Sequence, residues 1–169
     1  GATAVHEVIN SHFEAGNASQ PANPFGDWSG SGGAISIDWN GGLTIQGCSF
    51  RSNHADNYGG AIAATPNPLL SFDACLYGDP ACDNYDIVVD DCTFDGCSGQ
   101  FGGAIAWVNL GNFTGSELTM ENCIGHQQGG GFFSAFGTST LSDCSFTTCL
   151  AVDDGFGGGE AFGDSAGGG

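Results

Sequence analysis

The chain has 169 residues, a length that suits one domain with a sizeable hydrophobic core. It carries one basic residue, Arg51, and 19 acidic residues, so its formal net charge at pH 7 is −18. Without a cluster of Lys and Arg to neutralise phosphates, neither a nucleic acid nor an anionic membrane surface is expected as a partner. Hydrophobic residues make up 40% of the chain and charged residues 12%, which is not the composition of a disordered acidic tail.

The composition favours strands and turns over helices. The chain contains 31 Gly and a single Met, and most of its acidic residues are Asp, which prefers turns to helix interiors. No apolar run approaches the length of a membrane helix, so direct membrane insertion is not expected. The sequence has no signal-peptide pattern and ends in a Gly-rich stretch. We therefore expect one all-β domain over residues 1–169, a segment of a longer or polymerising protein.

Five copies of one sequence unit follow one another along the chain. In each copy a Ser or Cys has an apolar residue three positions before it, and in four of the five a Phe two positions after it. The Ser or Cys positions are Ser11, Cys48, Cys92, Cys123 and Cys144. The apolar positions are Val8, Ile45, Val89, Met120 and Leu141. The Phe positions are Phe13, Phe50, Phe94 and Phe146, with Gly125 in the fourth copy.

Two further positions of the unit predict corners. Asn53 follows the second Phe, and Cys97 and Cys149 take its place in the third and fifth copies. An Asn at a corner can satisfy backbone groups and tolerates left-handed geometry. Further along, Gly-Gly-Ala-Ile occurs at 32–35, 59–62 and 102–105. We expect these glycine pairs, including Gly59–Gly60 and Gly102–Gly103, to supply positive φ or a close approach of neighbouring coils.

The spacing of the copies predicts a β-solenoid. Segments 43–50, 85–94 and 102–108 are short, partly alternating and rich in β-branched residues, as strands are. The unit has about 21 residues, with insertions at 18–31 and 64–86, and such stacked units form solenoids. Strands of successive coils would pair in parallel, so that the phenylalanines stack in one interior column. The apolar residues Ile45, Val89, Met120 and Leu141 would form a second column.

The alternation of Gly-Gly-Ala-Ile with Phe-x-x-Asn resembles the repeats of the chlamydial polymorphic outer membrane proteins and related autotransporter passenger domains. The resemblance extends from about residue 5 to residue 162. Gly-Gly-Ala-Ile is complete three times, and Phe-x-x-Asn once, at Phe50–Asn53. The resemblance implies a right-handed parallel β-helix, here of about five to seven coils with two inserted loops. It also implies display outside the cell, for adhesion or as an elongated surface structure.

The eight cysteines, an even number, favour an oxidising, extracellular environment. Cys92 and Cys97 have the same spacing as Cys144 and Cys149, and a five-residue separation across a corner can bring Cα atoms within bonding range. We therefore predict the disulfides Cys92–Cys97 and Cys144–Cys149, and Cys75–Cys82 in the inserted loop. Cys48 and Cys123 are expected to stay reduced and buried. A competing scheme bonds stacked neighbours such as Cys48–Cys92.

Other side chains suggest ligands or modification. The sequons at Asn17 and Asn112 predict N-glycosylation if the secretion route offers it. The pairs Asp90–Asp91 and Asp153–Asp154 could bind Ca²⁺, although solvated turn acids are the favoured interpretation. No other cofactor is expected. The four histidines fall at different repeat positions and predict no metal cluster. Trp28, Trp39 and Trp107 could form a sugar platform, but packing is the favoured role.

Two functional hypotheses follow. The favoured one is a non-catalytic structural or adhesive module of an extracellular fibre, filament or stalk, which associates end to end with copies of itself or with neighbouring repeats. The alternative is a β-helix that binds or processes carbohydrate, with glycans as partners and paired carboxylates as catalysts. Arg51 is the only basic residue that could hold an acidic sugar, and the negative charge repels such a substrate. We therefore do not expect an enzyme.

Overall fold

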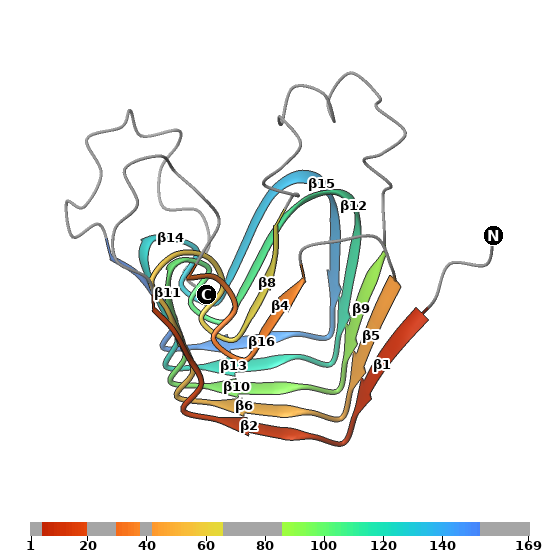
Figure 1. Cartoon of the computed structure of the whole chain (residues 1–169), viewed down its shortest axis with the longest axis horizontal. Helices are drawn as coiled ribbons and strands as arrows, with labels where there is room; N and C mark the ends of the chain where they lie inside the picture. Colours follow the sequence, from red (N-terminus) through yellow and green to blue (C-terminus); the bar gives the residue numbers. More distant parts are fainter. Residues whose placement is uncertain (1–4, 20–29, 38–41, 66–85, 153–169) are drawn as a thin grey trace.

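The computed structural model describes residues 5–19, 30–37, 42–65 and 86–152 (Figure 1). Within these ranges all regular elements are β-strands, so the all-β prediction is confirmed. No helix in this part of the chain is long and apolar enough to cross a membrane. Most of both predicted insertions, at 18–31 and 64–86, falls outside the described residues.

The strands form three sheets in which every pairing is parallel. The first sheet contains β1 (Val5–Ile9), β4 (Ile35–Ile37), β5 (Gly42–Gln46), β8 (Ile62–Ala64), β9 (Ile87–Asp90), β12 (Ile105–Ser116) and β15 (Phe132–Ser142). The second contains β2 (His12–Glu14), β6 (Ser49–Arg51), β10 (Thr93–Asp95), β13 (Thr119–Glu121) and β16 (Ser145–Thr147). The third contains β3 (Asn17–Ala18), β7 (His54–Ala55), β11 (Ser98–Phe101), β14 (Ile124–Gln128) and β17 (Leu150–Ala151).

The chain passes through the three sheets in turn and returns to the first, and we call one such passage a coil. Five coils stack on one another, as the ladder of β2, β6, β10, β13 and β16 shows in Figure 1. The long strands β12 and β15 each bend and belong to two coils: the start of β12 pairs with β8 and its end with β9. Curled parallel sheets of this kind are compatible with the predicted solenoid.

The predicted phenylalanine column is present in the second sheet. Phe13, Phe50 and Phe94 occupy equivalent positions in successive strands. The ring centroids of Phe13 and Phe50 are 5.0 Å apart and those of Phe50 and Phe94 are 4.8 Å apart, with the rings within 4° of parallel. Phe50 and Phe94 are each 1% exposed. The repeated Phe is therefore an interior packing residue, as expected.

The fourth copy of the repeat has a different register from the one predicted. Met120, not Gly125, pairs with Phe94 on one side and Phe146 on the other, so Met120 belongs to the phenylalanine column. Leu118 therefore lies at the position of Cys48 and Cys92, where Cys123 was predicted. Residues of adjacent coils that hydrogen-bond to each other here are 26 positions apart in the sequence. A coil without an insertion is therefore longer than the predicted repeat unit.

The second predicted column is corrected in the same way. Gly115, rather than Met120, lies between Val89 and Leu141. A Cβ on Gly115 would come within 2.7 Å of the Leu141 side chain and 2.8 Å of the Leu118 side chain. Leu118 and the nearby Phe113 are both buried. The small residue at one interior position thus compensates for larger ones beside it, so the volume of this core layer is conserved although the sequence pattern is not.

The first two corners of every coil contain one residue with positive φ. At the first corner, between the first and second sheets, these are Asn10, Gly47, Asp91, Glu117 and Asp143. At the second corner, between the second and third sheets, these are Ala15, Ser52, Gly96, Asn122 and Thr148. The left-handed residue beside Asn53 is thus Ser52, whereas Asn53 was predicted to tolerate that geometry itself. Because this conformation puts strain on any side chain, its recurrence shows that the corners require it.

Asn53 performs the other predicted role, that of satisfying backbone groups. Its side chain is buried and bridges to the coil before it: Nδ2 donates to the Phe13 carbonyl at 3.1 Å, and Oδ1 accepts from the Gly16 N–H at 2.9 Å. A buried amide with both ends paired stabilises this corner without an unsatisfied polar group.

The Gly-Gly pairs form the third corner, where the chain returns to the first sheet, and their two glycines have different roles. Gly59 and Gly102 have φ of 59° and 71°. Gly60 and Gly103 contact the backbone of the next coil: a Cβ on Gly60 would collide with the Gly103 carbonyl oxygen and lie 2.6 Å from the Ser98 nitrogen. Both expectations for this motif, positive φ and close approach, are therefore confirmed.

Candidate functional site

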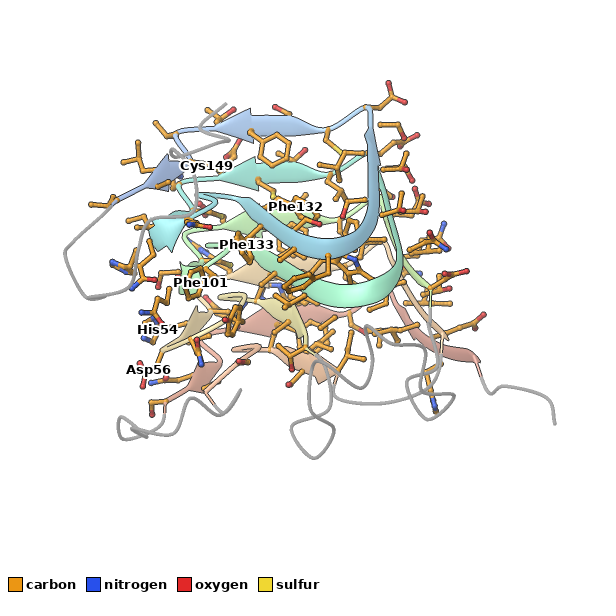
Figure 2. The ribbon with its side chains drawn as sticks, turned by 90° about the horizontal axis from the view of Figure 1, so that it is seen from above. His54, Asp56, Phe101, Phe132, Phe133 and Cys149 are labelled. Carbon is orange, nitrogen blue, oxygen red and sulfur yellow. The ribbon has the colours of Figure 1, made fainter. Side chains whose placement is uncertain are left out.

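A Ser–His–acid constellation lies on the outer face of the third sheet, and His54 and Asp56 lie side by side at the surface in Figure 2. His54 Nδ1 is 2.8 Å from Ser98 Oγ, and His54 Nε2 is 3.1 Å from Asp56 Oδ1. The arrangement follows from the strands, because residues i and i+2 share a face and Ser98 pairs with His54 in the parallel register.

The same arrangement occurs on the second sheet. His12 Nδ1 is 2.6 Å from Ser49 Oγ, and His12 Nε2 is 3.5 Å from Glu14 Oε2. His12 and Ser49 pair in the parallel register of β2 and β6. The two histidines lie at different positions of the repeat, as predicted. The arrangement that they share, a His paired with a Ser of the next coil and followed by an acid, was not predicted from the sequence. Its signal was a His-x-acid triplet on one strand and a Ser at the paired position one coil later.

The N–H groups of Ser98 and Ser49 take part in the backbone ladder, so neither is free to contribute to an oxyanion hole. An oxyanion is stabilised by free N–H groups near the nucleophile. The Ser98 N–H already donates to the Asn53 carbonyl at 2.9 Å, and the Ser49 N–H to the Ser11 carbonyl at 3.0 Å. The His54 and Asp56 side chains are also 39% and 41% exposed to water. The geometry instead links neighbouring coils by hydrogen bonds between side chains.

The acidic side chains of the outer faces are paired across coils in the same manner. Asp90 Oδ2 accepts from Gln46 Nε2 at 3.0 Å, and Asp90 Oδ1 accepts from Ser116 Oγ at 2.5 Å. Asp90, one of the four candidate Ca²⁺ ligands, therefore has both oxygens engaged with the coils on either side. In the described ranges, no three His, Cys, Asp or Glu residues are grouped so that they could hold a metal ion. Asp153 and Asp154 lie outside these ranges.

Arg51, the one basic residue, lies among acids on the outer face of the second sheet. Its Nε is 3.9 Å from Asp95 Oδ2, and both side chains are about half or more exposed. An exposed ion pair of this length contributes little to stability. It nevertheless places Arg51 against a carboxylate of the protein, so this surface offers an acidic sugar no strong cationic site.

Three aromatic side chains in the described ranges pack against one another. The ring centroids of Tyr58 and Phe101 are 4.9 Å apart, and the angle between the ring planes is 17°. The ring centroid of Phe133 lies 5.3 Å from that of Phe101 (Figure 2). A sugar packs on the face of a ring, and the faces that these rings turn toward one another are closed to a sugar. Burial raises the pKa of the Tyr58 hydroxyl above its ordinary value. Trp107 is fully buried, which confirms its packing role, and Trp28 and Trp39 lie outside the described residues.

The six cysteines within the described ranges are all free thiols. The predicted bonds Cys92–Cys97 and Cys144–Cys149 are therefore absent. Cys92 and Cys97 lie at different corners, with β10 between them, so each side chain belongs to a separate interior column. Cys48 and Cys123 are buried, as predicted, and both are free thiols in this structure. The predicted bond Cys75–Cys82 lies outside the described residues.

The two sequon asparagines are exposed. Asn17 lies in β3, and Asn112 lies in the bend of β12. Asn112 Nδ2 donates to Asp86 Oδ1 at 2.9 Å, so its amide takes part in another contact between coils. Glycosylation at both positions stays a prediction.

Comparisons of the chain with protein-family models, with curated proteins and with solved structures found no match. The family suggested by the repeats therefore stays a hypothesis.

Proposed function

We propose that the chain is a non-catalytic structural or adhesive module, a right-handed parallel β-helix that forms part of an extracellular fibre, filament or stalk. The right-handed winding is supported by the near-universal handedness of crossovers between parallel strands. The polymorphic outer membrane protein-like repeat and the acidic composition fit a secreted surface protein. The outer faces support a mechanical role, because side chains as well as backbones connect successive coils.

The observation that carries this proposal is the incomplete burial of the two end coils. Phe13 and Phe146, at the two ends of the phenylalanine column, are only partly buried, whereas Phe50 and Phe94 between them are almost inaccessible. Within the described residues, β2 pairs only with β6, and β16 only with β13. Strand edges that expose N–H and C=O groups promote the addition of further strands.

The two ends also match each other, which favours a second copy of the chain as the occupant. β2 and β16 each have three residues with Phe in the middle, and β3 and β17 each have two residues. If β2 of one copy pairs with β16 of another, Phe13 stacks on Phe146 at the coil spacing. The stack would continue the phenylalanine column and the parallel sheets from one copy to the next. End-to-end assembly is thus the mode of association that we propose.

Sedimentation velocity and electron microscopy of the 169-residue protein test the proposal. We expect concentration-dependent elongated assemblies. Phe146→Asp places a charge in the shared column and should return the protein to a monomer. The matched control is Leu150→Asp, in the same coil but on a side chain that is 55% exposed, and it should still assemble. A wild-type monomer at all concentrations, or turnover of a polysaccharide, would contradict the proposed function.

A further inference from the structure

Three cysteines form a continuous column inside the second corner. Each lies immediately before the first residue of a paired strand, so the three occupy the same position in consecutive coils: Cys97 before β11, Cys123 before β14 and Cys149 before β17. All three are buried free thiols. We call them the thiol column. The register correction creates this column, because the sequence repeat had placed Cys123 at the first corner.

The three thiols have equivalent surroundings. Each Sγ faces a backbone carbonyl of the preceding coil: Cys97 faces Phe50 at 3.7 Å, Cys123 faces Phe94 at 3.8 Å, and Cys149 faces Met120 at 3.3 Å. Parallel strands lie about 4.8 Å apart, so Cα atoms of adjacent members fall within the range of about 4.4–6.8 Å found in disulfides. Cys97 and Cys149 are two coils apart, about 9.6 Å, which is too far.

The thiols of Cys97 and Cys123 also interact with each other. They share a hydrogen bond, which lowers the pKa of Cys97 and raises the pKa of Cys123. The thiolate is the reactive form of cysteine in disulfide exchange, so one of the two cysteines must react with an oxidant before the core closes over both thiols.

We propose that Cys97 and Cys123 are the site of a disulfide bond that joins the third and fourth coils when the chain folds with a small-molecule disulfide as oxidant. The thiolate of one of the two cysteines attacks one sulfur of the oxidant and releases the other as a thiol, which gives a mixed disulfide. The other cysteine loses its proton and attacks the Sγ of the first, and the second small thiol leaves. Two protein thiols become one disulfide, and the oxidant is reduced to two thiols.

The first corner provides an internal comparison. Its column contains Cys48 and Cys92 in adjacent coils, then Leu118, then Cys144. Leu118 separates Cys144 from Cys92, so Cys144 has no cysteine in the adjacent described coil of its column and should stay reduced. The Cys92 Sγ accepts from the Cys48 N–H at 3.4 Å, so it faces the backbone of the neighbouring coil. The proposal concerns the second corner, where the thiols of Cys97 and Cys123 are hydrogen-bonded to each other, and it does not depend on the proposed function.

Peptide mapping tests the bond. The full chain is unfolded and reduced, then refolded with reduced and oxidised glutathione, and free thiols are blocked. Cleavage before Asp and after Glu separates Cys97, in fragment 95–117, from Cys123, in fragment 122–142, and from Cys144 and Cys149, in fragment 143–152. We expect a linked pair of fragments 95–117 and 122–142. The proposal would be overturned if these fragments carried blocked thiols and no link. A link between Cys92 and Cys97 would also overturn it.

Matched serine variants sharpen the assignment. Cys123→Ser should abolish disulfides in the thiol column, because Cys97 and Cys149 cannot reach each other. Cys149→Ser should leave the Cys97–Cys123 link unchanged. The oxidised wild-type protein should melt roughly 10 °C above the reduced one, and Cys123→Ser should show no such difference. If Cys123→Ser does not fold, the wild-type and Cys149→Ser maps still decide, and loss of the link in Cys149→Ser would contradict the assignment.

Discussion

The second and third corners turn the same chain, yet they tolerate different residues. At the second corner one residue of each coil is left-handed, and five different residue types occupy that position: Ala15, Ser52, Gly96, Asn122 and Thr148. At the third corner the Gly-Gly pair is retained in the four coils described there: 32–33, 59–60, 102–103 and 129–130.

The difference lies in what surrounds the backbone. A Cβ on Gly96 would meet only Ser52 Oγ, at 3.8 Å, so the second corner imposes a φ value but leaves space. A Cβ on Gly103 would collide with the Gly130 carbonyl oxygen and lie 2.6 Å from the Ile124 nitrogen. Conformational strain costs about 1–2 kcal/mol and many residues bear it, whereas a backbone collision can be relieved only if coils separate.

Gly103→Ala should produce the largest effect. The added methyl group must push the third and fourth coils apart and break main-chain hydrogen bonds, so we expect a loss of more than about 4 kcal/mol in the free energy of unfolding. Urea unfolding followed by circular dichroism measures it, and an insoluble or unfolded product counts as the expected result. A soluble variant with wild-type stability would show that the coils can separate locally at low cost.

Asn53→Ala should have the next largest effect, at the second corner. It leaves the Gly16 N–H and the Phe13 carbonyl without their partner, which costs about 2–4 kcal/mol for two buried groups. Asn53→Cys is the matched control, because Cys97 takes this position in the next coil, and it should lose less. Equal losses in urea unfolding would indicate that side-chain volume, not hydrogen bonding, determines the residue here.

Alkaline pH should destabilise the first corner, where Cys92 lies. Burial raises the pKa of Cys92 to about 11, so the unfolded chain releases this proton at lower pH than the folded chain. The free energy of unfolding should therefore fall as pH rises from about 9 and level off above about 11. Cys92→Ser should show a shallower fall over this interval, and identical pH profiles for the two proteins would contradict the assignment.

The sequence predicted the parts of the fold that depend on repeated residue types. The phenylalanine column and the glycine pairs were identifiable because the same residue solves the same packing problem in each coil. The fourth coil was misaligned because its core keeps volume rather than identity, with Met120 in place of Phe and Gly115 beside Leu118. The histidine constellations were missed because their partners lie 37 and 44 residues away in positions that only the register brings together.

Gly96→Ala should have the smallest effect and most directly tests the contrast between the corners. Ala15 occupies the equivalent position in the first coil with φ of 54°, so the protein already accepts a methyl group at this corner. The nearest atom to the new Cβ is at ordinary contact distance, and only left-handed strain is added, about 1 kcal/mol. Ala15→Gly should have the opposite effect on the free energy of unfolding. Relief of the left-handed strain should stabilise the protein by a similar amount, reduced by the extra conformational entropy of glycine in the unfolded chain. If Gly96→Ala destabilised the protein as much as Gly103→Ala, the second corner would tolerate a methyl group no better than the third, and the contrast between the two corners would fail. The retention of the Gly-Gly pair would then need another cause.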